Sequence, residues 1–161
     1  MNYIKGDLIK LFKKRQFDSI AHQCNCFKMG AGIVGKLAEE FPNLKQIAQG
    51  DPELLPGTYR TLQTPYGNIF NLFSQYKPGG CRMTGLDSFD IRKAYLEECV
   101  FELDMTENPQ HLGIPLIASG IAADPTLKIE GDDLGYFKYY IANIFKPLEA
   151  SGWQITVVVY E

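Results

Sequence analysis

A strand-like stretch that leads into a glycine turn is the first segment of this chain whose residue types could bind an anion. It begins near His22 and reaches Gly30-Ala31-Gly32, after which apolar residues recur at helical spacing. Glycine allows backbone N–H groups to approach an anion closely, and the N-terminus of a helix adds a partial positive charge. The same glycines would also suit a tight turn without a ligand. The anion hypothesis assigns the contacts to consecutive residues, namely Gly30, Ala31, Gly32, Ile33 and Val34.

A second run of small residues follows the apolar stretch Gly113–Ser119, which is predicted to be a strand. The backbone of this run could form another anion cradle at the end of that strand. Close packing under a helix explains the run equally well when it is viewed alone. Two such turns at one edge of a sheet would form a clamp for a diphosphate. The second half of that clamp would comprise Ser119, Gly120, Ile121, Ala122 and Ala123.

Individual side chains in the same regions could add acid–base and hydrogen-bonding chemistry. His22 lies near the end of its predicted strand, where an imidazole could exchange a proton near neutral pH, although a lone histidine is more often part of a core. Asp7 follows the first predicted strand. It could accept a hydrogen bond from an exocyclic amine such as that of adenine, or it could cap the next helix. Cys24 and Cys26 have no neighbouring partner that would lower their pKa, so neither is a predicted nucleophile.

Strands and helices alternate along the chain, and this order predicts where those segments meet. The expected strands cover residues 3–5, 19–25, 58–63, 68–75, 113–119 and 154–160, and the expected helices cover 8–12, 33–41, 88–107 and 136–150. The apolar strands lack period-two alternation, which is typical of a sheet buried on both faces. We therefore expect a single α/β domain over residues 1–161, a three-layer α/β/α sandwich with a central mixed sheet. Ligands of such sheets bind outside the carboxyl ends of the strands, where these loops should meet.

Composition excludes several other classes of protein. The net charge of −3 opposes a nucleic-acid partner or an anionic membrane surface, and no run of about 20 apolar residues is present. The four cysteines and two histidines lack the spacing of a structural zinc site or a disulfide framework. We therefore expect no metal and no cofactor. The chain shows no signal-peptide pattern, so we expect it in the cytoplasm.

In this order, the segments resemble the macrodomain family of ADP-ribose-binding modules. The resemblance extends over essentially the whole chain and depends on three stretches: Tyr3–Leu8, Ile20–Ile33 and Ile114–Ile121. Within the family, the chain is most similar to the branch of ADP-ribose 1''-phosphate phosphatases and small phage-encoded members. That branch has histidine and cysteine before the motif asparagine, as in His22-Gln23-Cys24-Asn25.

The resemblance implies a role for each matching position. Asp7 would bind the adenine amine with Leu8 beside it, Tyr160 would flank the adenine ring, and Asn25 would hold the distal ribose. Residues 30–34 and 119–123 would wrap the diphosphate from two sides. Terminal ADP-ribosyl-glutamate hydrolases of a related branch use a lysine and an aspartate at positions that hold Gln75 and Ala122 here. Lysine-dependent chemistry is therefore not expected.

The resemblance implies an enzyme that removes the terminal phosphate of ADP-ribose 1''-phosphate. His22 would act as a general acid or base, Asn25 would orient the distal ribose or a water, and Asp124 would be a second acid–base group. The partner would be a small ADP-ribose derivative or an ADP-ribosylated protein. Three alternatives stay open: hydrolysis of an ADP-ribosyl ester or of O-acetyl-ADP-ribose, reading of ADP-ribose without turnover, and a nucleotide-binding α/β protein of another family.

Overall fold

A mixed sheet of six strands forms the centre of the computed structural model, which describes residues 1–29, 32–47 and 54–161. The strand order is β1-β6-β5-β2-β4-β3, and every neighbouring pair is parallel except β3 and β4. The predicted mixed sheet is therefore confirmed. The strands are β1 (Asn2–Gly6), β2 (Ser19–Asn25), β3 (Thr58–Thr64), β4 (Gly67–Gln75), β5 (His111–Ile114) and β6 (Gln154–Tyr160).

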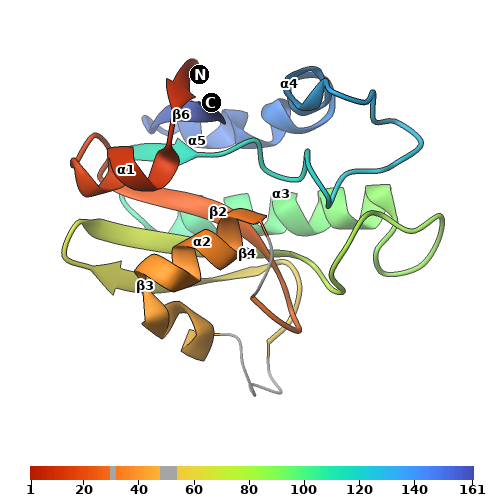
Figure 1. Ribbon diagram of the computed structural model, residues 1–161, viewed down its shortest axis with the longest axis horizontal. Helices are drawn as coiled ribbons and strands as arrows, with labels where there is room; N and C mark the ends of the chain where they lie inside the picture. The colour runs from red at the N-terminus through yellow and green to blue at the C-terminus, as the bar shows by residue number, and fades with distance from the viewer. Residues whose placement is uncertain (30–31, 48–53) are drawn as a thin grey trace.

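Helices cover both faces of this sheet (Figure 1). One face carries α1 (Leu8–Lys13), α2 (Gly32–Glu40) and a 3-10 turn (Pro42–Ile47), and the other carries α3 (Phe89–Thr106) and the segment 133–150. Adjacent residues of β2 point to opposite faces, so Ile20 packs with the α1 and α2 side while Ala21 packs with the α3 side. The predicted three-layer arrangement is confirmed.

The expected strand Gly113–Ser119 ends earlier than its apolar run suggests. β5 stops at Ile114, because Pro115 has no N–H to continue the ladder. The chain then turns: the N–H of Ile117 donates to the carbonyl oxygen of Pro115 at 2.8 Å, and Ala118 has a φ of 62°. The correction matters for the site, since residues 115–118 leave the sheet and become available to line a cavity.

The expected helix over 136–150 is also wrong in detail. The chain forms α4 (Asp133–Tyr136), a π-helical segment (Phe137–Ile141), a 3-10 segment (Ala142–Phe145) and α5 (Lys146–Ala150). Pro147 lies in the first turn of α5, where its missing N–H costs no helical hydrogen bond. Pro147 thus stands at the start of the last helix.

The carboxyl ends of the five mutually parallel strands lie at one edge of the sheet. Gly6 and Tyr160 are register partners there on β1 and β6, and Asn25 is paired with Gln75 at the ends of β2 and β4. Four loops therefore leave the sheet at this edge together with the end of β6. No helix within the described residues combines the length and apolar character that crossing a membrane requires.

Candidate ligand-binding cleft

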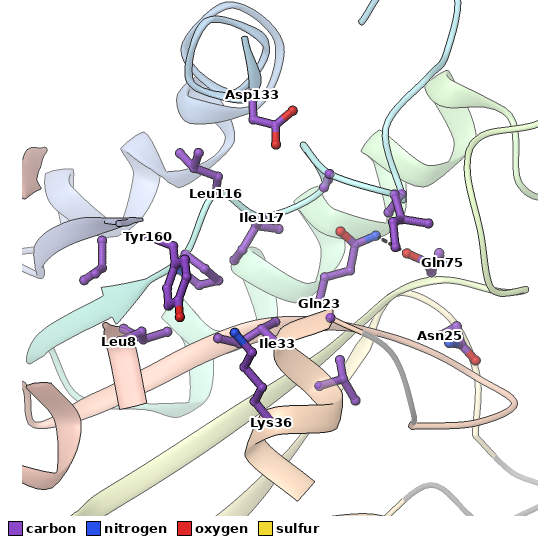
Figure 2. A pocket seen from close by; sticks show the side chains of 18 of the residues that line it. Leu8, Gln23, Asn25, Ile33, Lys36, Gln75, Leu116, Ile117, Asp133 and Tyr160 are labelled. Carbon is purple, nitrogen blue, oxygen red and sulfur yellow. Dashed lines mark hydrogen bonds between the residues drawn. The ribbon is translucent and has the colours of Figure 1, made fainter. Parts of the chain in front are cut away.

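A cavity of about 490 Å³ lies at this carboxyl edge (Figure 2). This volume is within the usual range for sites that bind small molecules. Every loop that leaves the edge contributes to the wall, so residues from the whole length of the chain meet here. The lining residues are Gly6–Ile9, Gln23, Asn25, Lys28, Gly32–Val34, Lys36, Gln75, Pro78, Gly79, Pro115–Ala118, Gly120–Ala122, Asp133, Val158 and Tyr160.

Asp7 serves as the N-cap of α1 and also lines the cavity. Its Oδ1 atom accepts hydrogen bonds from the N–H groups of Ile9 at 3.0 Å and Lys10 at 3.1 Å, so the capping alternative is confirmed. The Oδ2 atom accepts no hydrogen bond from the described residues and can receive a donor in the cavity. The cap and a ligand contact are therefore compatible in one carboxylate.

Tyr160 places an aromatic ring next to this end of the cavity. It is the last residue of β6, and 65% of its surface is exposed. The Nζ atom of Lys36, from α2, lies 4.3 Å from the centroid of the ring, and Figure 2 shows both side chains beside Leu8 and Ile33. One polar acceptor and one exposed ring thus stand together where β1 and β6 end.

Two glutamines form the floor between β2 and β4. The Nε2 atom of Gln75 donates to the carbonyl oxygens of Lys77 at 2.8 Å and Gly79 at 3.4 Å, which leaves its Oε1 as an acceptor. The Nε2 atom of Gln23 donates to that Oε1 at 2.6 Å. Gln75 stands where the resemblance places a lysine in the related branch. This position therefore carries a neutral amide whose orientation is fixed by hydrogen bonds.

Asn25 occupies the rim at the end of β2. Its Oδ1 atom accepts hydrogen bonds from the N–H groups of Phe27 and Lys28, both at 2.9 Å. This turn uses the carbonyl end of the side chain and leaves the Nδ2 amide to donate to a ligand. Lys28 lines the cavity beside it and adds a positive charge.

The two predicted halves of the anion clamp face the same cavity where the structure describes them. From the first half, Gly32, Ile33 and Val34 line it, whereas Gly30 and Ala31 lie outside the described residues. Gly32 has a φ of 62°, a conformation that favours glycine at the start of α2.

From the second half of the clamp, Gly120, Ile121 and Ala122 line the cavity. Ser119 and Ala123 are buried and outside the lining, and the Oγ atom of Ser119 donates to the carbonyl oxygen of Ile117 at 3.0 Å. These two residues support the loop from below and do not offer groups to a ligand.

His22 does not reach the cavity, contrary to its expected acid–base role. It is fully buried, its Nε2 atom lies 2.6 Å from the Oδ1 atom of Asn71, and burial lowers its pKa to about 4. Neighbouring residues of a strand point to opposite faces, so Gln23 faces the cavity and His22 faces the core. In this position His22 cannot exchange a proton with a bound ligand.

Asp124 is also outside the lining. The Oδ1 atom of Asp124 accepts hydrogen bonds from the backbone N–H of Thr126 at 2.9 Å and from the Oγ1 hydroxyl of Thr126 at 2.7 Å. The carboxylate thus shapes a turn in the loop between β5 and α4. The predicted second acid–base group is not brought to the cavity.

Four polar lining residues were not expected from the sequence: Gln23, Lys28, Lys36 and Asp133. Lys36 follows Ile33 by one helical turn, and this spacing could have identified it. Asp133 belongs to an acidic run that is typical of a solvated loop, and it forms a 3.0 Å ion pair with Lys128. In the parts of the chain that the structure describes, no three histidine, cysteine, aspartate or glutamate side chains gather as a metal site would require.

Comparison with known proteins finds relatives at the level of structure. Neither a family model nor a curated protein matches the sequence. The macrodomain of Thermus aquaticus DarG superposes with a TM-score of 0.64 at 14% identity, covering 99% of this chain and 97% of that chain. Thermosipho africanus DarTG in complex with ADP-ribose gives a TM-score of 0.68 at 10% identity, covering 98% of this chain and 40% of that chain.

The Oceanobacillus iheyensis macrodomain with ADP gives a TM-score of 0.53 at 16% identity, covering 98% of this chain and 81% of that chain. Identities this low carry information about the fold, and the agreement extends over nearly the whole chain in each case. The order of strands and the helices on both faces are therefore those of a known architecture. This chain has the macrodomain fold.

Proposed function

We propose that the cleft binds ADP-ribose, either free or as the ADP-ribosyl group of a modified protein. The observation that carries this proposal is one cavity that has a carboxylate and an exposed aromatic ring at one end and two backbone segments along its walls. Asp7 and Tyr160 stand at one end, and residues 32–34 and 120–122 form the walls. Two neighbours with the same fold are described with ADP-ribose and with ADP, which supports this choice of ligand.

In the proposed complex, each part of the ligand has a chemically suitable counterpart. The free Oδ2 atom of Asp7 would accept from the adenine amine while the ring stacks beside Tyr160. The N-terminus of α2 would stabilise the diphosphate through its dipole and its backbone N–H groups, with the second turn opposite. The Nδ2 amide of Asn25 and the side chain of Gln23 would meet the distal ribose.

Removal of a terminal phosphate from ADP-ribose 1''-phosphate is a second candidate function. Lys28 favours it, because this cationic residue lines the cavity together with Asn25 and could balance the charge of that phosphate. His22 and Asp124 are not part of this proposal, since both lie outside the lining. A water oriented by the substrate and by Asn25 would have to attack, and the same arrangement would serve an ADP-ribosyl ester or O-acetyl-ADP-ribose.

Calorimetric titration tests the binding proposal. We expect ADP-ribose to bind about tenfold or more tightly than AMP, since AMP lacks the second phosphate and the distal ribose. NAD, which carries nicotinamide on the distal ribose, should also bind more weakly. A preference for AMP or NAD would contradict the assignment of the cleft to ADP-ribose.

Product analysis separates the catalytic candidates from a reader. The protein would be incubated with ADP-ribose 1''-phosphate, O-acetyl-ADP-ribose and an ADP-ribosylated protein. Release of phosphate from ADP-ribose 1''-phosphate, with no product from the other two substrates, would support the phosphatase. Release of acetate from O-acetyl-ADP-ribose, or of ADP-ribose from the modified protein, would support an ester hydrolase. Binding without any product would identify a reader. The Lys28→Met variant should lose phosphatase turnover while it retains ADP-ribose binding.

A further inference from the structure

Arg92 is a buried arginine that does not line the cleft, and its contacts distinguish it from an ordinary ion pair. Arg92 and Asp87 each expose only 4% of their surface, and the Nε atom of Arg92 donates to Oδ1 of Asp87 at 3.0 Å. A buried charge of this kind requires several further partners to offset its lost hydration. Those partners show which parts of the chain the guanidinium holds.

The remaining guanidinium nitrogens donate to two loops that come from different places in the sequence. The Nη1 atom donates to the carbonyl oxygens of Gly79 at 2.8 Å and Ala122 at 3.2 Å, and Nη2 donates to the carbonyl oxygen of Lys77 at 3.1 Å. One planar side chain thus connects the loop after β4 to the loop after β5. Gly79 and Ala122 both line the cleft.

Asp87 completes this connection from the other side. Its Oδ1 atom accepts a hydrogen bond from the N–H of Tyr76 at 2.9 Å, and its Oδ2 accepts from the N–H of Lys77 at 3.1 Å. The carboxylate therefore balances the charge of Arg92 and holds the start of the same loop. A lysine in place of Arg92 could balance the charge but could not present donors in three fixed directions.

The two loops are already in contact where Arg92 joins them. The N–H of Cys81 donates to the carbonyl oxygen of Ala123 at 3.2 Å. A methyl group added at Gly80 would lie 3.1 Å from that same oxygen and 3.2 Å from the carbonyl oxygen of Ile121. The separation of the loops is therefore set closely, and a small change in it would alter the wall of the cleft.

We propose that Arg92 is a positioning residue that sets the separation of these two loops and thereby selects ligands with a distal ribose over mononucleotides. This inference rests on the proposed ADP-ribose function and adds a determinant of specificity to it. The adenine end of the cleft is built from β1, β6 and α2, which Arg92 does not contact in the described structure. Loss of the guanidinium should therefore affect the diphosphate and the distal ribose of a bound ligand, of which AMP carries only the first phosphate.

The test compares ADP-ribose and AMP on the Arg92→Lys variant by calorimetry, below the unfolding temperature of each protein. We expect the affinity for ADP-ribose to fall about tenfold and that for AMP to stay within about twofold of wild type. Equal losses for both ligands, or none for either, would overturn the proposal, because a purely stabilising arginine has no reason to discriminate between them.

Two further variants make the result specific. Gly80→Ala keeps Arg92 but pushes the loops apart, so it should produce the same selective loss. Asp104→Asn is the matched control on α3: it alters the 3.0 Å hydrogen bond from Ser151, which lies outside the cleft lining, and should leave both affinities unchanged. A selective loss in Asp104→Asn, or unaltered selectivity in Gly80→Ala, would count against the proposal.

Hydrogen exchange of the ligand-free protein tests the connection without any assumption about the ligand. In Arg92→Lys, amides of residues 77–82 and 119–124 should exchange faster together, while β1, β6 and α2 keep wild-type rates. Unchanged exchange in either loop would overturn the proposal even if binding changes. If wild-type protein fails to bind ADP-ribose while both loops respond, the proposed function fails and the connection through Arg92 stands.

Discussion

The Nε2 atom of His22 and the Oδ1 atom of Asn71 lie 2.6 Å apart inside the sheet. The Nδ2 amide of Asn71 donates to the carbonyl oxygens of Arg60 at 3.0 Å and Ile69 at 3.3 Å, which uses both of its protons. Its Oδ1 atom must therefore accept, so Nε2 of His22 carries the proton. Burial of the ring favours the neutral imidazole more strongly than the hydrogen bond to Asn71 favours the charged one, and this preference has a measurable consequence.

The stability of the protein should fall as the pH drops from about 6.5 to 4. Burial lowers the pKa of His22 from 6.5 to about 4, so the unfolded chain binds a proton in this range that the folded chain does not. The contribution of neutral, buried His22 to the free energy of unfolding is fully present above pH 6.5, and roughly 3 kcal/mol of it is lost by pH 4. Chemical denaturation at a series of pH values measures it.

The variant His22→Gln provides the comparison for this prediction. Glutamine keeps a side-chain N–H near Asn71 but does not titrate, so the loss of stability between pH 6.5 and 4 should become smaller. The variant should also retain ADP-ribose binding at pH 7, because His22 does not line the cleft. A pH dependence equal to that of wild type would show that another group is responsible.

Asp7 should affect stability and ligand binding through different oxygens. Asp7→Ala removes the cap of α1 and should lower the free energy of unfolding by about 1 kcal/mol. Asp7→Ser keeps a capping oxygen and should cost only a few tenths of a kcal/mol. Both variants should lose affinity for ADP-ribose, as calorimetry would show. If Asp7→Ser binds as tightly as wild type, the carboxylate does not contact the adenine amine.

Replacement of Tyr160 should weaken binding with little effect on folding. Stacking of a base on an aromatic ring contributes about 1–3 kcal/mol, so Tyr160→Ala should lose roughly fivefold to 150-fold in affinity. Tyr160→Phe should retain most of it. Tyr139→Ala is a suitable control, because Tyr139 is 82% exposed and outside the lining. Equal affinities for Tyr160→Ala and wild type would exclude stacking on this ring.

Gly32 and Gly85 form a matched pair for separating strain from ligand contact. Both have a left-handed φ, 62° and 85°, and an added Cβ would meet no atom of the described residues within 4 Å at either position. Alanine should therefore cost about 1–2 kcal/mol of stability at each. Only Gly32→Ala should also reduce ADP-ribose affinity, since Gly32 lines the cleft and starts α2. Equal affinities in the two variants would remove the first turn from the ligand site.

Local signals were sufficient for most elements of the fold. The strands β2, β4 and β6 and the helix α3 lie close to the ranges that their apolar patterns predict. Ser88 accepts a hydrogen bond from the N–H of Ile91 and caps α3, a signal that depends only on neighbouring residues. The hydrogen-bonding pattern over 133–150 was not predictable in this way, because packing of Phe137, Ile141 and Phe145 against the sheet overrides local helix propensity.

The order of strands and loops along the chain was enough to predict which loops meet, because parallel strands bring their carboxyl ends to one edge, and Asp7, Gly32, Gly120 and Tyr160 follow or end those strands. Which side chains of each loop face the cavity became clear from the folded structure alone. The side chains of His22 and Gln23 point to opposite faces of β2, and the sequence does not show which of the two faces the cavity. The role of Arg92 was equally unpredictable from the sequence, since its partners are carbonyl oxygens of two loops that only the completed fold brings within hydrogen-bonding distance.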